Sequence, residues 1–405
     1  MKILIANWVY NWGSTGYLVR DLVDELAYMG HHVIAATAVM HGEDSRVYVF
    51  MKPKEWGFFW RLGHIGLPRL SGSKTSARRL IALIEEQKPD IVNLHLLHCH
   101  TIDLYYLLRY LGKHNIKTVL TNHAEIYYTG NCEHAYNCCR WIECQCTGCK
   151  DKRRATGSFL FGNPHQNWLK MKQAMDYFKP ENLYLTAVSP WMKERIGQSP
   201  ITKGFECKTV LNGLNIRIFS RRYNIEWIHE RIGREGFLLH VTAKFEPKDK
   251  DDVKGSYYLV KLAEIMPDMQ FVVVATSVGD TDGLPPNISV WGKAKDQDEL
   301  AELYSAAQLS VLVSRRETYS MVTAESLCCG TPVVGFKAGG PESIAIPSAS
   351  EFVEQRDVEG LSRSIRNMLG SNFDRIAISE EAREKYNPVM MAKGYLETYE
   401  KVIAL

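Results

Sequence analysis

The chain has 405 residues, of which 45% are hydrophobic and 23% are charged, and its formal net charge is +3. This length is enough for two domains with separate cores, and the composition is that of a globular chain. The small net charge argues against nucleic acid as a partner, and no run of about eighteen apolar residues predicts a transmembrane helix.

The first half of the chain alternates apolar, β-like runs with helical segments. Leu18, Leu22 and Leu26 recur at four-residue spacing, which predicts a helix with one apolar face. Near-continuous apolar strands between such helices are typical of a parallel sheet covered on both faces. The predicted strands are 2–7, 32–38, 91–95 and 118–122, and the predicted helices are 17–29, 74–87 and 103–114.

The second half repeats this alternation. We therefore predict an α/β protein made of two Rossmann-like, doubly wound domains. A last helix is expected at about 388–405. The predicted strands of this half are 237–242, 270–275, 288–291, 309–313 and 332–336.

The segment 315–325 carries the strongest functional signal. It joins an apolar, β-prone run to a helical run that Gly330 and Pro332 end. Ser320 is predicted to cap this helix, whose first N–H groups, at Met321 and Val322, would then favour a diphosphate. The carboxylates of Glu317 and Glu325 could each accept hydrogen bonds from the hydroxyls of one ligand, as on ribose or a hexose.

This pattern resembles that of a known family. Glu317-x7-Glu325, followed by Gly330-Thr331-Pro332 and Gly339-Gly340-Pro341-Glu342, is similar to the signature of the retaining, nucleotide-sugar-dependent glycosyltransferases of family 4, which have the GT-B fold. The resemblance implies two Rossmann-like domains facing across a cleft. They would be an acceptor-side domain, 1–212, with the helix 388–405 packing back on it, and a nucleotide-sugar-binding domain, 213–387.

The resemblance also assigns roles to single residues. Gly13 and Gly16 would face the donor diphosphate, although a plain tight turn also explains two such glycines. His123, which follows a predicted strand, would hydrogen-bond the donor sugar, where the alternative is an ordinary loop histidine. Lys244 and Lys254 would neutralise the diphosphate in place of a metal, although loops often expose lysines. The predicted catalytic residues are thus His123, Glu317 and Lys244, and no cofactor is required.

Six of the ten cysteines lie between positions 132 and 149. In a cytosolic chain a cluster with a Cys-x-x-Cys pair more often marks metal binding than disulfides. Cys132, Cys138 or Cys139, Cys146 and Cys149 could supply four thiolates to a structural zinc. Free thiols or a disulfide remain equally open.

The acceptor side is indicated by one segment only. Residues 52–61 interleave aromatic and basic side chains, a mixture typical of binding to an anionic bilayer, although aromatics folded into the domain would explain it too. The N-terminal run 1–6 lacks the apolar core of a signal peptide. We expect a cytoplasmic protein that can lie at the inner face of the membrane.

The sequence therefore predicts a retaining enzyme that moves a hexosyl group from a UDP- or GDP-sugar to a glycan or lipid-linked acceptor in bacterial surface polysaccharide synthesis. One alternative is a storage-glucan synthase or phosphorylase of the same fold. Another is a sugar-nucleotide-binding regulator without turnover.

Overall fold

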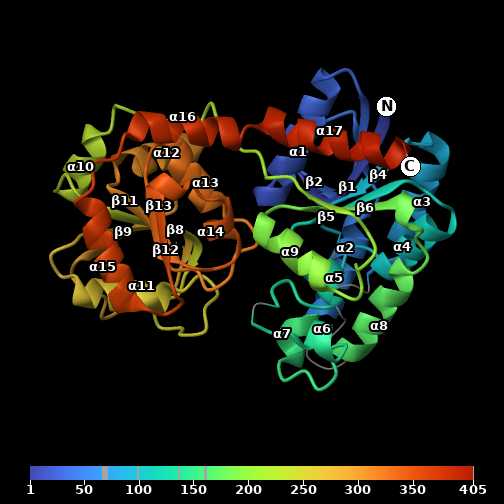
Figure 1. Ribbon diagram of the computed structural model, residues 1–405, viewed down its shortest axis with the longest axis horizontal. Helices are drawn as coiled ribbons and strands as arrows, with labels where there is room; N and C mark the ends of the chain where they lie inside the picture. The colour runs from blue at the N-terminus through green and yellow to red at the C-terminus, as the bar shows by residue number, and fades with distance from the viewer. Residues whose placement is uncertain (66–71, 98–99, 136, 159–161, 405) are drawn as a thin grey trace. The chain divides into compact units, whose positions relative to one another are not determined.

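The computed structural model describes residues 1–65, 72–97, 100–135, 137–158 and 162–404. The chain divides into two compact units. The first contains residues 1–212 and 391–405, and the second contains residues 213–390. Each unit is built on its own sheet (Figure 1).

The described part of the first unit holds a seven-stranded sheet in the order β3-β2-β1-β4-β5-β6-β7, with every neighbouring pair parallel. The strand order reverses between β1 and β4, and ligands of such sheets bind beyond the carboxyl ends of the strands at this point. The strands are β1 (Lys2–Tyr10), β2 (His32–Met40), β3 (Val47–Val49), β4 (Ile91–Leu94), β5 (Thr118–Asn122), β6 (Leu183–Ala187) and β7 (Cys207–Thr209).

Helices cover the faces of this sheet. The C-terminal helix α17 lies beside α1 (Figure 1), and its Tyr395 and Tyr399 belong to the same core as Leu22 and Ile5. The helices are α1 (Gly13–Tyr28), α2 (Pro53–Ile65), α3 (Lys74–Gln87), α4 (Leu104–Lys113), α5 (Ile126–Thr129), α6 (Arg140–Glu143), α7 (Lys152–Thr156), α8 (Pro164–Met175), α9 (Pro190–Gln198) and α17 (Pro388–Ala404).

The second unit holds a six-stranded sheet, again parallel throughout, in the order β10-β9-β8-β11-β12-β13. Its order reverses between β8 and β11, so the carboxyl ends of these two strands mark the second expected ligand position. The strands are β8 (Leu238–Phe245), β9 (Phe271–Val278), β10 (Ile288–Gly292), β11 (Leu309–Leu312), β12 (Val333–Phe336) and β13 (Ser350–Val353).

Helices lie on both faces of the second sheet as well. On one face α11 packs against α15, while α13 packs against α12 and α16 (Figure 1). The helices are α10 (Glu226–Ile232), α11 (Ser256–Ile265), α12 (Gln297–Ala306), α13 (Met321–Cys328), α14 (Gly340–Ile344), α15 (Val358–Leu369) and α16 (Arg375–Lys385). The predicted fold class, two doubly wound domains, is confirmed.

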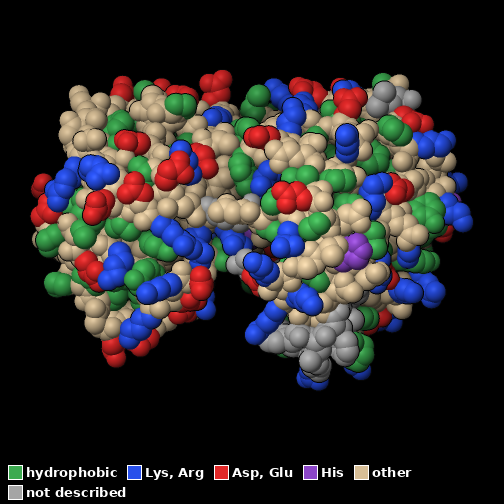
Figure 2. Space-filling view, turned by 60° about the horizontal axis from the view of Figure 1, so that its bottom comes forward, with side chains coloured by type: hydrophobic (Ala, Val, Ile, Leu, Met, Phe, Trp, Pro, Cys, Tyr) green, Lys and Arg blue, Asp and Glu red, His purple; other side chains and the backbone are tan. Residues whose placement is uncertain are grey.

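Charges of both signs are interspersed on the face of the molecule drawn in Figure 2. This distribution agrees with the small net charge of +3. None of the helices in the described ranges is long and apolar enough to cross a membrane.

Candidate active site

Ser320 begins helix α13 in an unusual backbone conformation. Its φ is 87°, a left-handed value that costs energy for any residue with a Cβ, and its Oγ accepts a hydrogen bond from Thr323 N at 3.2 Å. The predicted N-cap is therefore confirmed. Strained residues of this kind persist where the surrounding structure holds them, and they cluster at functional sites.

The loop that carries Glu317 is clamped by the glycines of the predicted motif. Glu317 N donates to Ala338 O at 3.0 Å, and Gly340 N donates to Glu317 O at 2.9 Å. A Cβ at Gly340 would lie 2.5 Å from the carbonyl carbon of Thr318, so no larger residue fits there without moving the backbone. Gly339 has a φ of 106°, which only glycine adopts readily. The Gly339–Gly340 part of the motif therefore fixes the position of the loop that carries Glu317.

Glu317 meets one of the two predicted lysines. The Nζ of Lys254 lies 2.8 Å from Glu317 Oε1, and this carboxylate raises the pKa of Lys254. The next residue, Gly255, has a φ of 74°, and a Cβ there would lie 1.9 Å from Val313 O, just beyond β11. The backbone of the Lys254–Gly255 pair therefore packs directly on the end of the central strand, which brings the ammonium group to the carboxylate.

Lys244 is placed differently. It lies near the end of β8, its side chain is 59% exposed, and its Nζ is 2.9 Å from Glu246 Oε1. The structure thus joins Glu317 to Lys254, which follows the acidic and basic insert 248–252, and keeps Lys244 on a separate ion pair at the surface.

Glu325 is half-buried on helix α13. It accepts a hydrogen bond from Tyr304 Oη at 3.0 Å, and burial raises its pKa to about 7. A carboxyl group in this state gains from any ligand that donates hydrogen bonds to it, since these stabilise its ionised form. Tyr304 has no motif around it, and the sequence did not single it out.

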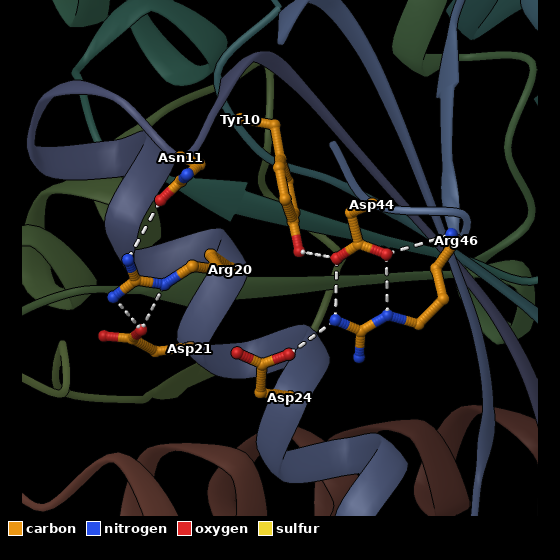
Figure 3. Close-up of polar contacts among 7 residues, drawn as sticks. All are labelled: Tyr10, Asn11, Arg20, Asp21, Asp24, Asp44 and Arg46. Atoms are coloured by element: carbon orange, nitrogen blue, oxygen red, sulfur yellow. Dashed lines mark hydrogen bonds and ion pairs between the residues drawn. The ribbon is translucent and has the colours of Figure 1, made fainter. Parts of the chain in front are cut away.

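The loop between β1 and α1 is fixed by polar contacts (Figure 3). Asn11, with a φ of 57°, accepts from Arg20 at 2.9 Å and donates to His41 O at 3.1 Å. Gly13 has a φ of 66°, and a Cβ on Gly16 would lie 3.3 Å from Val9 Cγ1. Both predicted glycines belong to the first turn of α1, which starts four residues before the predicted helix at position 17.

A second polar group holds the neighbouring loop between β2 and β3. Tyr10 Oη donates to Asp44 at 2.9 Å, and Arg46 bridges Asp44 and Asp24 at 2.7 and 2.6 Å (Figure 3). The loops at this edge of the first sheet are therefore tied to β1 and α1 by charge-assisted hydrogen bonds.

His123 directly follows β5 and is buried. Its Nε2 lies 2.9 Å from Nδ1 of His95, the residue after β4. Burial lowers the pKa of His123 to about 4, so the imidazole is neutral at physiological pH. His95 was not predicted from the sequence, because no motif surrounds it.

The predicted zinc ligands lie in the cysteine loop, residues 132–149. Cys146 is buried with its Sγ 3.8 Å from Thr129 O, whereas Cys138 is exposed. No group of three or more His, Cys, Asp or Glu side chains in the described ranges is placed to hold a metal ion. Cys132, Cys146 and Cys149 are free thiols, and burial raises the pKa of Cys146 to about 12. Burial, and then the neighbouring Cys138 and Cys149, raise the pKa of both Cys132 and Cys146, so the four thiols lie in one neighbourhood and their binding of zinc stays a prediction.

Two family models match the chain. Glycosyltransferase Family 4 matches residues 15–215, in the first unit, and Glycosyl transferases group 1 matches residues 280–385, in the second. The chain belongs to the family 4 glycosyltransferases. The resemblance predicted from the Glu317-x7-Glu325 signature is thereby confirmed.

Known proteins similar to this glycosyltransferase include N-acetyl-alpha-D-glucosaminyl L-malate synthase of Bacillus anthracis. The two are 23% identical over 207 residues, which cover 49% of this chain and 53% of that protein. The chain spans about half the length, or less, of the curated relatives it matches.

Solved structures match over nearly their whole length. Sucrose-phosphate synthase from Thermosynechococcus elongatus superposes with a TM-score of 0.65 at 16% identity, covering 100% of this chain and 99% of that one. HepE of Anabaena, in complex with UDP and glucose, superposes with a TM-score of 0.65 at 14% identity, covering 99% of both chains. These likenesses show that the glycosyltransferase has the GT-B fold.

Proposed function

We propose that this protein is a retaining glycosyltransferase that moves a hexosyl group from a UDP- or GDP-sugar to a glycan or lipid-linked acceptor in bacterial surface polysaccharide synthesis. The observation that carries this proposal is the Lys254–Glu317 ion pair beside the N-terminus of α13, at the switch point of the second sheet. Cation, helix N-terminus and carboxylate together suit a diphosphate bonded to a sugar.

Each part of this cluster has a chemical task. The N–H groups of Met321 and Val322, together with Lys254 and Lys244, stabilise the negative charge that develops on the departing nucleoside diphosphate. No metal ion is needed for that stabilisation. Glu317 accepts from the hydroxyls of the transferred sugar, and Glu325, deeper in α13, accepts from the ribose. HepE, a protein of the same fold, was solved with UDP and glucose.

The first unit, with the end of α17, serves the acceptor in this proposal, and the second unit binds the nucleotide sugar. Gly13 and Gly16 let the start of α1 approach a phosphate closely, because neither carries a Cβ. His123, neutral and buried, is suited to hydrogen-bond a sugar hydroxyl rather than to pair with a charge.

A donor panel tests the proposal. UDP-, GDP- and ADP-hexoses are compared by thermal shift and by release of nucleoside diphosphate, with and without a chelator. We expect one donor to stabilise the protein and to be hydrolysed slowly, unchanged by chelator, and the anomeric proton of the first sugar product to show retention by NMR. Glu325→Ala should lose both responses, whereas Glu235→Ala, at an exposed position of the same unit, should keep them. If no donor stabilises the protein and none is hydrolysed, the proposal is refuted.

Helix α2 supports an acceptor held at a membrane. Trp56, Phe58 and Trp60 are 37%, 58% and 49% exposed, and Lys52 and Lys54 flank them. Such a surface suits the interface of an anionic bilayer. We expect the protein to sediment with vesicles of anionic lipid more than with neutral ones. Phe58→Ser should reduce this binding, and Tyr28→Ser, at a 90% exposed position of α1, should not.

A further inference from the structure

A continuous chain of buried polar side chains lies behind His123. Asn93, in β4, contacts two partners through its amide nitrogen: Tyr399 Oη of helix α17 at 2.7 Å and His95 Nε2 at 3.0 Å. His95 Nδ1 then contacts His123 Nε2 at 2.9 Å. All of these side chains are buried. The sheet order makes this chain possible, because β4 and β5 are neighbours and both histidines follow directly at their carboxyl ends.

The orientation of Asn93 is set by its other neighbours. Its Oδ1 accepts from Thr121 Oγ1 at 3.0 Å, and Thr121 Oγ1 in turn accepts from Thr186 Oγ1 at 2.9 Å. The hydroxyl hydrogen of Thr121 is therefore directed at Asn93, whose oxygen must face it. The amide nitrogen, with two hydrogens and no lone pair for a hydrogen bond, then faces Tyr399 and His95.

This orientation determines the proton positions of both imidazoles. His95 Nε2 accepts from Asn93, so the single hydrogen of the neutral ring lies on Nδ1 and is donated to His123 Nε2. His123 Nε2 is therefore an acceptor, and the hydrogen of its neutral ring lies on Nδ1. The backbone of His95 is held as well, because Tyr127 Oη donates to its carbonyl oxygen at 2.6 Å.

We propose that His95, oriented by Asn93, is a positioning residue that holds His123 as the Nδ1–H tautomer, so that His123 donates a hydrogen bond to the sugar donor and does not act as a base. The donation to the sugar rests on the proposed function, whereas the tautomer does not. Histidines are commonly set in this way by the partner of their second ring nitrogen. A histidine whose Nε2 is already engaged cannot take a proton there without breaking the bond to His95.

The tautomer is measured directly by ¹⁵N NMR of protein labelled in its 13 histidines, with His123 assigned from the signal that His123→Gln removes. We expect a neutral His123 with its hydrogen on Nδ1 in the wild type. In His95→Phe, which keeps an aromatic ring but no hydrogen-bond donor, the His123 signal should shift toward the Nε2–H form. A wild-type His123 with its hydrogen on Nε2, or a tautomer unchanged in His95→Phe, would overturn the proposal without any need for turnover.

Kinetics separate positioning from a merely structural role. His95→Phe should lower kcat for donor hydrolysis about 10- to 100-fold, as loss of an orienting partner does for metal-bound histidines, with the donor KM changed less than about threefold. His95→Asn places an amide N–H near the position of Nδ1 and should recover most of the lost rate. Equal loss in both variants, with wild-type tautomer retained, would show that His95 only supports the fold. If no donor is turned over by the wild type, the proposed function fails while the NMR result still decides the tautomer.

Discussion

The carboxyl edges of the two sheets are built in opposite ways. Charged groups meet at the edge of the second unit, where Lys254 forms an ion pair with Glu317. Glycines at this edge allow the backbones of neighbouring loops to come into contact. The edge of the first unit centres on a neutral, buried chain from Asn93 through His95 to His123. Charges lie around this chain, in the loops of Figure 3 and in the ion pair of the buried Glu125 with Arg195. Charged clusters suit a diphosphate, and neutral hydrogen-bonding groups suit sugar hydroxyls.

The largest effect is expected where the second edge depends on close backbone approach. Gly255→Ala places a Cβ 1.9 Å from Val313 O and should lower the free energy of unfolding by more than about 3 kcal/mol, measured by urea denaturation. Gly233→Ala is the matched control. Gly233 has a similar φ of 78° but no atom within 4 Å of an added Cβ. Gly233→Ala should therefore lower the free energy of unfolding by only about 1 kcal/mol. Equal losses would mean that backbone conformation, not contact, requires the glycine.

The half-buried Glu325 carboxyl of the second edge should make stability depend on pH. The folded pKa of Glu325, about 7, lies above its unfolded value of 4.5. The unfolded state therefore releases its proton first, and stability falls as pH rises from 4.5 to 7, by at most about 3 kcal/mol. Glu325→Gln keeps an acceptor for Tyr304 but cannot ionise, so its stability should not fall over this pH range. The variant should be more stable than wild type at pH 8, with the difference vanishing below pH 4.5. A difference that does not change with pH would contradict the raised pKa of Glu325.

The sequence predicted the second edge better than the first, for a physical reason. Glu317, Ser320 and Glu325 lie within nine residues, so a local pattern of strand, cap and helix was enough to place them, and the structure confirms the cap. The bond between His95 and His123 depends on which strands are neighbours in the sheet, which no local pattern contains. The predicted zinc site has the same limit, since cysteine spacing alone does not determine whether a long loop brings four thiolates to one ion.

The fold itself was largely predictable. The alternation of apolar strands and helices predicted a strand at 118–122 with the bounds observed for β5. The strands that were missed include β3, β7 and β13, of three or four residues each, because so short a run shows no periodicity. The start of α1 was placed too late, since Gly13 and Gly16 suggested a loop although they form its first turn.

Turnover should distinguish the two lysines of the second edge. Lys254→Met removes the cation that touches Glu317 and should lower kcat for donor hydrolysis about 100-fold, the usual cost of losing one group that stabilises developing negative charge. Lys244→Met, at a position paired with Glu246 on the surface, should cost less than about tenfold. The reverse order would show that donor binding moves Lys244 to the phosphates, and that the ion pair of Lys254 has a structural role.

The smallest effect concerns the charged loops of the first edge. Arg46 and Tyr10 hold the pKa of Asp44 at about 2, below its usual 3.8, so the pair stabilises the folded state above pH 3.8 and loses this effect as pH falls through 2. Because these groups are partly exposed, Asp44→Asn should cost only about 1 kcal/mol at pH 7, measured by urea denaturation. Asp24→Asn, which removes the more exposed partner of Arg46, should cost less. If Asp44→Asn costs as much as Gly255→Ala, the first edge depends on charge as strongly as the second, and the contrast between a neutral edge and a charged one does not hold.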